Sequence, residues 1–215
     1  MAQTQQFGGF PVAALDFYDD LELDNTKSFW TAHKAVYDQA VQAPMEALIT
    51  ALADEFGPGK VFRPYRDVRF AKDKTPYKDH QGAFVAAGPA TGWYVEVGAP
   101  GVRVGAGFYH AEPDRLAAIR TAVADPVRGA GLELILAGLE RRGWSRNGEQ
   151  LKTAPRGYAV DHPRIELLRH KDLAMGRSYG FDEMVHTPEL LTQVRKDWRA
   201  ARPFVEWVLR AVEGV

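Results

Sequence analysis

The residues between 60 and 80 form the densest group of charged side chains in the chain. Seven basic residues stand against three aspartates there, an excess of positive charge within a chain whose net charge is −1. Guanidinium groups suit bidentate contacts to carboxylate or phosphate, and tyrosines can add a stacking or hydroxyl contact. The segment therefore predicts a binding site for a small phosphate- or carboxylate-bearing molecule. Its predicted contacts in this segment are Arg63, Arg66, Arg69, Lys74, Tyr77 and Lys78.

The same charges also allow a purely structural explanation. Asp67 could pair with Arg69 and Asp73 could cap a turn, which would leave the other cations on a solvated hairpin face. Arg66 bears on the choice, because period-two alternation places it on the apolar face of a predicted strand. A guanidinium buried there must meet a carboxylate, a group of carbonyls or a bound anion, and the sequence leaves the three open. The apolar residues of that face are Phe62, Val68 and Phe70.

A second candidate feature is the strand predicted over residues 102–109. Its apolar side chains alternate with a face that carries Arg103, Gly105, Gly107 and Tyr109. Glycines that follow one another on one face weaken a strand and usually mark a bulge or a close approach to the backbone. A packed helix would explain them, and so would a ligand. In the ligand hypothesis, Gly105 and Gly107 form the floor of the pocket and Tyr109 lies beside them.

Residues 152–158 form a second basic loop, and its Arg156 is the remaining predicted contact for the anion. A solvated surface loop is the alternative. If the protein is an enzyme, Asp67 or His162 is the expected acid or base, because each could reach an anion held by arginines. The six histidines match no metal-ligand spacing and are interpreted as solvated or capping side chains, so we expect no metal site. The sequence identifies no cofactor.

Several classes of protein are excluded by residues and motifs that the sequence lacks. It has no cysteine, and therefore no disulfide, thiolate nucleophile or cysteine-based zinc site. It also lacks a phosphate loop, a dinucleotide fingerprint, a zincin motif and a nucleophile elbow. Neither a secretory signal nor a stretch of about 20 apolar residues is present, so we expect a cytoplasmic protein without a membrane partner.

Two other functions remain as alternatives to a small-anion site. A nucleic-acid-binding module would use the same cations along a phosphate backbone, although the net charge of −1 argues against it. A non-catalytic interaction or structural domain would use the charges as an ion-pair lattice. The sequence does not decide whether catalysis occurs, and it indicates no oligomeric state.

Helices are predicted toward both ends of the chain. In the first third, three segments have apolar residues at helical spacing and begin near Pro11, near Asp24 with Asn25, and at Pro44. After the strands, the same spacing returns. The later helices are expected over residues 115–124 and 126–141, and from Pro163, Thr187 and Pro203.

Between these helical regions the period of the apolar residues changes from 3.6 to 2, which is typical of strands. The expected strands cover residues 61–70, 82–87, 93–98, 102–109 and 173–179, and a loop covers residues 143–161. Short connections favour an antiparallel meander, because parallel neighbours need a crossover of about a dozen residues. We therefore predict one α+β domain over residues 1–215, with a mainly antiparallel sheet flanked by N-terminal and C-terminal helices.

Residues 62–78 read Phe-Arg-Pro-Tyr-Arg-Asp-Val-Arg-Phe-Ala-Lys-Asp-Lys-Thr-Pro-Tyr-Lys. This stretch resembles the central motif of a bacterial and fungal family called domain of unknown function 2461. Residues 104–109 and 151–163 are also similar to that family, and the resemblance extends from about residue 10 to about residue 171. It implies a single α+β domain without an established activity. It also implies that three segments are hallmarks of the family: the basic segment (residues 60–80), the glycine strand (residues 102–109) and the Arg156 loop (residues 152–158).

Overall fold

The computed structural model describes residues 6–69, 72–109 and 111–214. Its strands are β1 (Gly59–Val61), β2 (His80–Gly88), β3 (Thr91–Gly98), β4 (Gly101–Phe108), β5 (Ser145–Asn147) and β6 (Leu173–Gly180). They form one six-stranded sheet in the order β1-β2-β3-β4-β6-β5. β1 pairs with β2, and β5 with β6, in antiparallel register. The predicted α+β class is confirmed.

The chain groups into two compact units. The first comprises residues 1–85, 94–104 and 178–196, and the second comprises residues 86–93, 105–177 and 197–215. Strands β2, β3, β4 and β6 contribute residues to both units. The expectation of one domain over the whole chain stays a prediction.

The central strands lie where alternation predicts them. β2, β3 and β4 overlap residues 82–87, 93–98 and 102–109, and β6 confirms the strand expected over residues 173–179. Two-residue connections separate β2 from β3 and β3 from β4, which suits antiparallel neighbours. The predicted loop over residues 143–161 is wrong at its start, because β5 pairs with β6 there. Three exposed residues are too few to give an alternation signal.

The strand predicted over residues 61–70 is wrong for most of its length. β1 ends at Val61, and the rest of the described segment has one isolated antiparallel bridge, between Tyr65 and Tyr77. Pro64 and Pro76 lie on the two sides of this bridge and have no N–H to donate to a strand ladder. The side chains between them form hydrogen bonds with one another instead. Phe70, assigned to this strand, lies outside the described residues.

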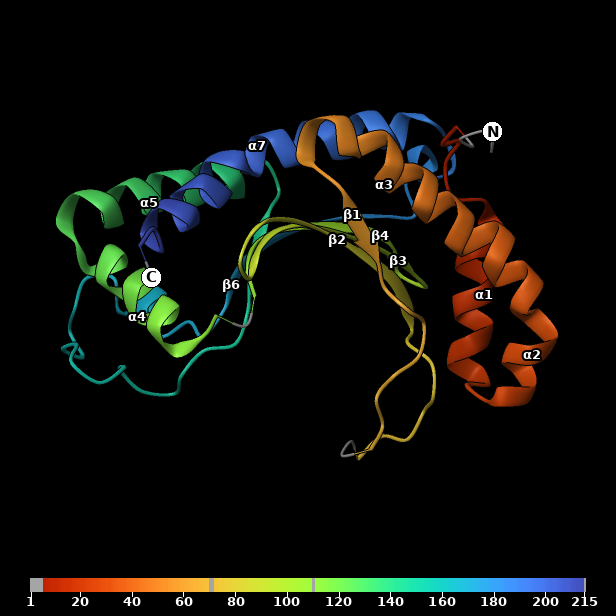
Figure 1. Ribbon diagram of the computed structural model, residues 1–215, viewed down its shortest axis with the longest axis horizontal. Helices are drawn as coiled ribbons and strands as arrows, with labels where there is room; N and C mark the ends of the chain where they lie inside the picture. The colour runs from red at the N-terminus through yellow and green to blue at the C-terminus, as the bar shows by residue number, and fades with distance from the viewer. Residues whose placement is uncertain (1–5, 70–71, 110, 215) are drawn as a thin grey trace. The chain divides into compact units, whose positions relative to one another are not determined.

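The helices that precede the sheet are α1 (Val12–Leu23), α2 (Lys27–Val36) and α3 (Ala43–Phe56). All three are predicted, but the π-helical turn η1 (Tyr37–Gln42) joins α2 to α3 where the sequence suggests separate helices. α2 begins after Thr26, whose hydroxyl oxygen accepts a hydrogen bond from the N–H of Phe29 at 3.2 Å. Asp24 and Asn25, the predicted cap, are therefore not the cap. Figure 1 shows α1 and α2 side by side.

The second unit contains the predicted helices α4 (Pro113–Ala124), α5 (Pro126–Glu140) and α6 (Ile165–Leu168). Prolines occupy the first turn of α4 and α5, where their missing N–H costs no intrahelical hydrogen bond. The carboxylate of Asp125 caps α5, accepting from the N–H groups of Val127 at 2.9 Å and Arg128 at 2.7 Å.

The C-terminal segment contains the 3-10 turn η2 (Glu183–His186) and one long helix, α7 (Glu189–Ala211). The sequence predicts a new helix at Pro203, but this proline lies inside α7. Buried residues recur every three or four positions along α7, and their burial outweighs the one hydrogen bond that the proline removes. None of the helices in the described residues has both the length and the apolar composition that crossing a membrane requires.

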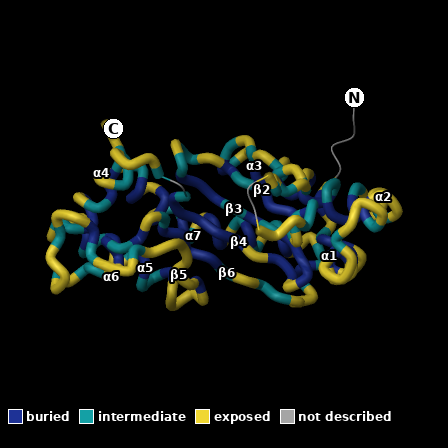
Figure 2. Tube along the Cα trace, turned by 90° about the horizontal axis from the view of Figure 1, so that it is seen from below, coloured by how far each residue is buried: buried dark blue, intermediate teal, exposed yellow. Residues whose placement is uncertain are grey.

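Strand β4 is buried almost throughout, as the dark blue tube in Figure 2 shows. Val102, Val104, Ala106 and Phe108 are at most 2% exposed, which confirms the predicted inward face. The opposite face, which the sequence leaves nearly bare, is covered as well except at Arg103. The glycines of this strand therefore lie against other parts of the protein.

Candidate functional site

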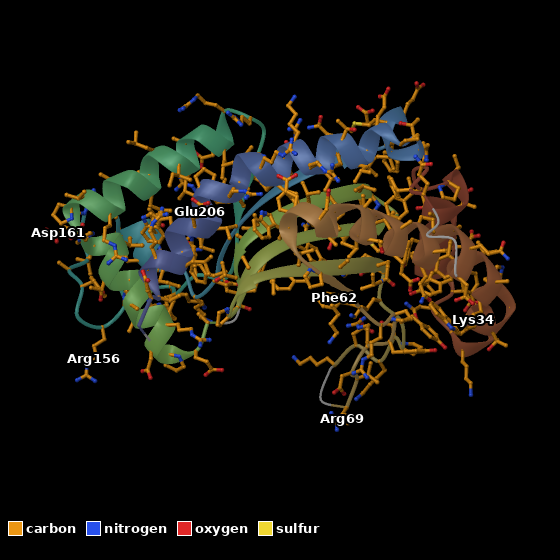
Figure 3. All side chains as sticks on the ribbon, turned by 45° about the horizontal axis from the view of Figure 1, so that its top comes forward. Lys34, Phe62, Arg69, Arg156, Asp161 and Glu206 are labelled. Carbon is orange, nitrogen blue, oxygen red and sulfur yellow. The ribbon has the colours of Figure 1, made fainter. Side chains whose placement is uncertain are left out.

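The loop of residues 62–79 connects β1 to β2 in the first unit and contains the predicted basic site. Figure 1 shows this loop, in orange to yellow, extending away from the two strands. Backbone hydrogen bonds join its two arms, among them one from the N–H of Lys78 to the carbonyl of Pro64 at 2.8 Å. Figure 3 shows Phe62 near the strands and Arg69 near the far end of the loop. The loop is therefore a hairpin that spreads its charged side chains along its length.

Arg66 is held within the loop by Asp73 and Thr75. Its guanidinium donates to Asp73 Oδ2 and to the hydroxyl oxygen of Thr75. Asp73 also accepts from the N–H of Thr75 at 2.9 Å and from its hydroxyl at 3.0 Å. Of the three partners that the sequence leaves open for Arg66, the structure shows a carboxylate. The side chain of Arg66 is only partly buried, because the predicted strand does not form.

Asp73 is expected to stay ionised to low pH. The Thr75 N–H, the Arg66 guanidinium and the Thr75 hydroxyl lower the pKa of Asp73 to about 2, from 3.8. The pKa of Asp73 is lower in the folded state than in the unfolded state, so its ionised carboxylate stabilises the folded state. This stabilisation is complete above pH 3.8 and is lost as the pH falls toward 2. NMR titration of the Asp73 carboxyl carbon should give a midpoint near 2 that rises in Arg66→Met. A midpoint near 3.8 in the wild type would contradict this loop geometry.

Arg69 forms a bidentate pair with Asp67. The distances are 2.9 Å from Nε to Oδ1 and 2.7 Å from Nη2 to Oδ2, and the hydrogen bonds to Arg69 lower the pKa of Asp67. The structural alternative expects this pair and the turn cap by Asp73, and both contacts are present. The ammonium of Lys74 donates to the carbonyl of Val68 at 2.9 Å. Several charged side chains of the segment therefore form ion pairs or hydrogen bonds within the loop itself.

Tyr77 anchors the loop to α2. It is 5% exposed, and its ring stacks on Trp30 with centroids 4.2 Å apart and planes 6° from parallel. The side-chain amide of Asn25 bonds the backbone of Tyr77 twice, donating to its carbonyl at 3.1 Å and accepting from its N–H at 3.2 Å. Sequence reasoning missed this role of Asn25, since residues 52 positions apart leave no local signal.

Arg63 and Lys78 differ from Arg66 and Arg69. Among the described residues, neither side chain forms an ion pair or a hydrogen bond. The ammonium of Lys78 lies 5.3 Å from the ring centroid of Phe62. Burial, and after it the charge of Arg63, lower the pKa of Lys78. Within the described part of the chain, these two neighbouring cations at the base of the loop therefore have neither an ion pair nor a hydrogen bond.

Gly105 and Gly107 lie in the second unit, in β4. A Cβ atom at Gly107 would be 2.3 Å from the carbonyl oxygen of Leu173 and 2.7 Å from the Cα of Ala174. The backbone of Gly107 also has a φ of 149°, which an L side chain rarely adopts. The close approach predicted at this glycine is therefore made by the neighbouring strand β6, and Gly107 gives no support to a ligand.

Tyr109, Arg156 and His162 also belong to the second unit. Arg156 is exposed, and Figure 3 shows its side chain pointing away from the ribbon. Nδ1 of His162 accepts from the N–H of Arg164 at 3.0 Å, as a capping histidine would. The N–H of Tyr109 donates to the carbonyl of Ala90 at 2.7 Å. The gathering of these residues with the basic loop around one ligand stays a prediction.

A cavity of about 360 Å³ lies in the first unit, next to the residues that end the basic loop. Its polar side chains are Glu22, Asp79, His80, Glu96, Arg103 and Ser178. No three histidine, aspartate or glutamate side chains in the described ranges are arranged to hold a metal ion. The sequence does not predict this cavity, because its lining comes from separate strands and a helix. Only the adjacency of Asp79 and His80 is visible in the sequence.

The comparisons with known proteins give a family and no named relative. No curated protein matches the chain. The family model described as conserved hypothetical protein (DUF2461) matches residues 13–207, a range that contains the basic loop, β4 and the residues that line the cavity. The chain therefore belongs to the family of conserved hypothetical proteins DUF2461, in agreement with the resemblance of residues 62–78.

Proposed function

We propose that the loop of residues 62–79 binds a small molecule with a phosphate or carboxylate group, and that Arg63 and Lys78 contact this group directly. The observation that supports the proposal is the absence of an ion pair for either side chain among the described residues. Two like charges disfavour each other's charged state, and burial of Lys78 adds to that cost. A bound anion would relieve both effects through charge-assisted hydrogen bonds.

The other cations of the loop would support the binding of the anion without being its main contacts. Arg66 and Arg69, each held by an aspartate, would fix the shape of the loop. Lys74 would add an ammonium that has two N–H groups left after its bond to a carbonyl. Tyr77 would hold the loop on α2. Further roles that remain predictions are those of Asp67, Gly105, Gly107, Tyr109, Arg156 and His162.

A structural role is the second candidate, and the pairs Asp67–Arg69 and Arg66–Asp73 favour it. Exposed pairs of this kind contribute about 0–1 kcal/mol each, so they order a loop more than they stabilise a fold. The two candidates differ at Arg63 and Lys78, because the ion pairs among the described residues include neither side chain.

Thermal denaturation with inorganic pyrophosphate, citrate or a single-stranded oligonucleotide tests the proposal. At about 100 times the dissociation constant, a small anion should raise the midpoint of the wild type by about 5–10 °C. The double variant Arg63→Met/Lys78→Met should lose this rise. Arg66→Met should lower the midpoint without ligand, because it leaves Asp73 without its cation.

The matched control is Lys27→Met/Lys196→Met, which removes two exposed cations from the same unit and should keep the full rise. The proposal is wrong if neither small anion raises the wild-type midpoint, or if the Arg63→Met/Lys78→Met variant responds as the wild type does. A response to the oligonucleotide alone, with steep salt dependence, would favour nucleic-acid binding instead.

A further inference from the structure

The cavity next to the basic loop presents hydrogen-bond acceptors and donors close together. Oε2 of Glu96 accepts from the hydroxyl of Tyr94 at 2.6 Å, and Oε1 lies 3.0 Å from Nε of Arg103. Each carboxylate oxygen has a second lone pair, and the guanidinium has four further N–H groups. The volume of about 360 Å³ falls in the range of small-molecule binding sites.

His80 adds a ring nitrogen to this lining. Its Nδ1 lies 2.7 Å from Oδ1 of Asp79, an arrangement that favours the tautomer with hydrogen on Nδ1. Its Nε2 lies 3.7 Å from Oε2 of Glu96, which is too far for a hydrogen bond. Gly98 allows this placement, since a Cβ there would be 3.2 Å from the Cβ of His80. Nε2 therefore forms no hydrogen bond with Glu96 and can form one with a ligand hydroxyl, as an acceptor in the neutral ring or as a donor in the protonated ring.

Hydroxyl groups suit this mixed lining better than anions or apolar groups. A hydroxyl donates one hydrogen bond, to a carboxylate or to Nε2 of His80, while its oxygen accepts from Arg103. A second anion would be repelled by Glu22, Asp79 and Glu96, all of which line the cavity. An apolar group would leave these polar atoms without partners. The cavity thus fits the hydroxylated part of a ligand.

Aromatic rings connect the cavity to the proposed anion contacts, all within the first unit. The ammonium of Lys78 is 5.3 Å from the ring centroid of Phe62, which is 6.4 Å from that of Tyr94. The hydroxyl of Tyr94 reaches Glu96. Gly82 in β2 leaves room for this ring, since a Cβ there would be 2.4 Å from the hydroxyl oxygen of Tyr94. The two rings are half-buried and can pack against a carbon skeleton.

We infer that the ligand is a phosphorylated, polyhydroxylated molecule of the sugar-phosphate class. Its phosphate binds Arg63 and Lys78, its carbon skeleton packs on Phe62 and Tyr94, and its hydroxyl groups enter the cavity and bind Glu96. This inference rests on the proposed function, because the phosphate uses the same two cations.

Isothermal titration calorimetry with ribose 5-phosphate, inorganic phosphate and free ribose tests the inference. The wild type should bind ribose 5-phosphate about tenfold or more tightly than inorganic phosphate, since one or two added hydrogen bonds give a difference of this order. Glu96→Gln should keep the affinity for inorganic phosphate and lose most of the tenfold preference. His80→Ala, a second variant, should act in the same direction.

Glu183→Gln, an exposed carboxylate in η2 of the same unit, is the control and should keep the preference. Equal affinity of the wild type for ribose 5-phosphate and inorganic phosphate would overturn the inference and leave the proposed function standing. An unchanged preference in both cavity variants would also overturn it. Failure of the wild type to bind either phosphate compound would count against the proposed function itself.

Discussion

Trp30→Ala is expected to lower the free energy of unfolding by about 3–5 kcal/mol, the cost of removing a large buried aromatic side chain. Trp30 is 5% exposed, and its ring lies against the rings of four residues. The centroid distances are 4.2 Å to Tyr77, 4.7 Å to Tyr37, 5.8 Å to Phe17 and 6.0 Å to Tyr65. Alanine would leave a cavity between α2 and the loop that these rings cannot fill without moving.

Urea denaturation followed by circular dichroism measures this loss. Trp30→Phe should cost much less, because it keeps a ring and removes an indole N–H that is buried without a partner among the described residues. Phe181→Ala is the matched control in the same unit: this ring is 70% exposed, and its loss should cost below about 0.5 kcal/mol. A loss below about 1 kcal/mol for Trp30→Ala would show that the stack on Tyr77 does not anchor the loop.

The anchor also has a consequence for the proposed site. Tyr77 immediately precedes Lys78, and its ring and backbone are fixed by Trp30 and Asn25. The position of the Lys78 ammonium relative to Arg63 therefore depends on contacts outside the loop. Trp30 would act as a positioning residue, and its removal should weaken anion binding along with the fold.

Alternation and helical spacing predict the parts of this fold that bury one face. β4 carries valine, valine, alanine and phenylalanine at every second position, and all four are buried. The same rule fails for residues 61–70, where Arg66 bonds Asp73, Arg69 bonds Asp67, and the described part of the segment beyond β1 forms a single isolated bridge instead of a paired strand. α7 shows a similar limit at Pro203, where burial along the helix outweighs a local stop signal.

The candidate site is predictable only where its residues are close in sequence. The cations of residues 60–80 are visible as a cluster, but which of them are neutralised depends on the loop closing on itself. The sequence offers Asp67 and Asp73 as partners, and it cannot show that neither Arg63 nor Lys78 forms an ion pair with any described residue. The cavity cannot be predicted from the sequence, because its lining residues are far apart along the chain. They come from α1 (Glu22), β2 (His80), β3 (Glu96) and β4 (Arg103).

Gly107→Ala is expected to lower the free energy of unfolding by roughly 2–4 kcal/mol, as the sum of backbone strain and overpacking. A methyl group there would lie 2.3 Å from the carbonyl oxygen of Leu173, which belongs to a paired strand and cannot easily move. The φ of 149° adds strain for any L side chain. Urea denaturation again gives the change.

Gly131→Ala, in helix α5 of the same unit, is the control for Gly107→Ala. Nothing lies within 4 Å of a Cβ at Gly131, so alanine should raise the stability there by up to about 1 kcal/mol through its helix propensity. The outcome at Gly107 decides between the two explanations of the glycine strand. If Gly107→Ala is as stable as the wild type, β6 leaves room for a methyl group at this position. The absence of a side chain there then needs another explanation, such as the close approach of a ligand. A large loss means that the glycine is needed for strand packing, which removes Gly107 from the proposed anion site and leaves the basic loop as its candidate.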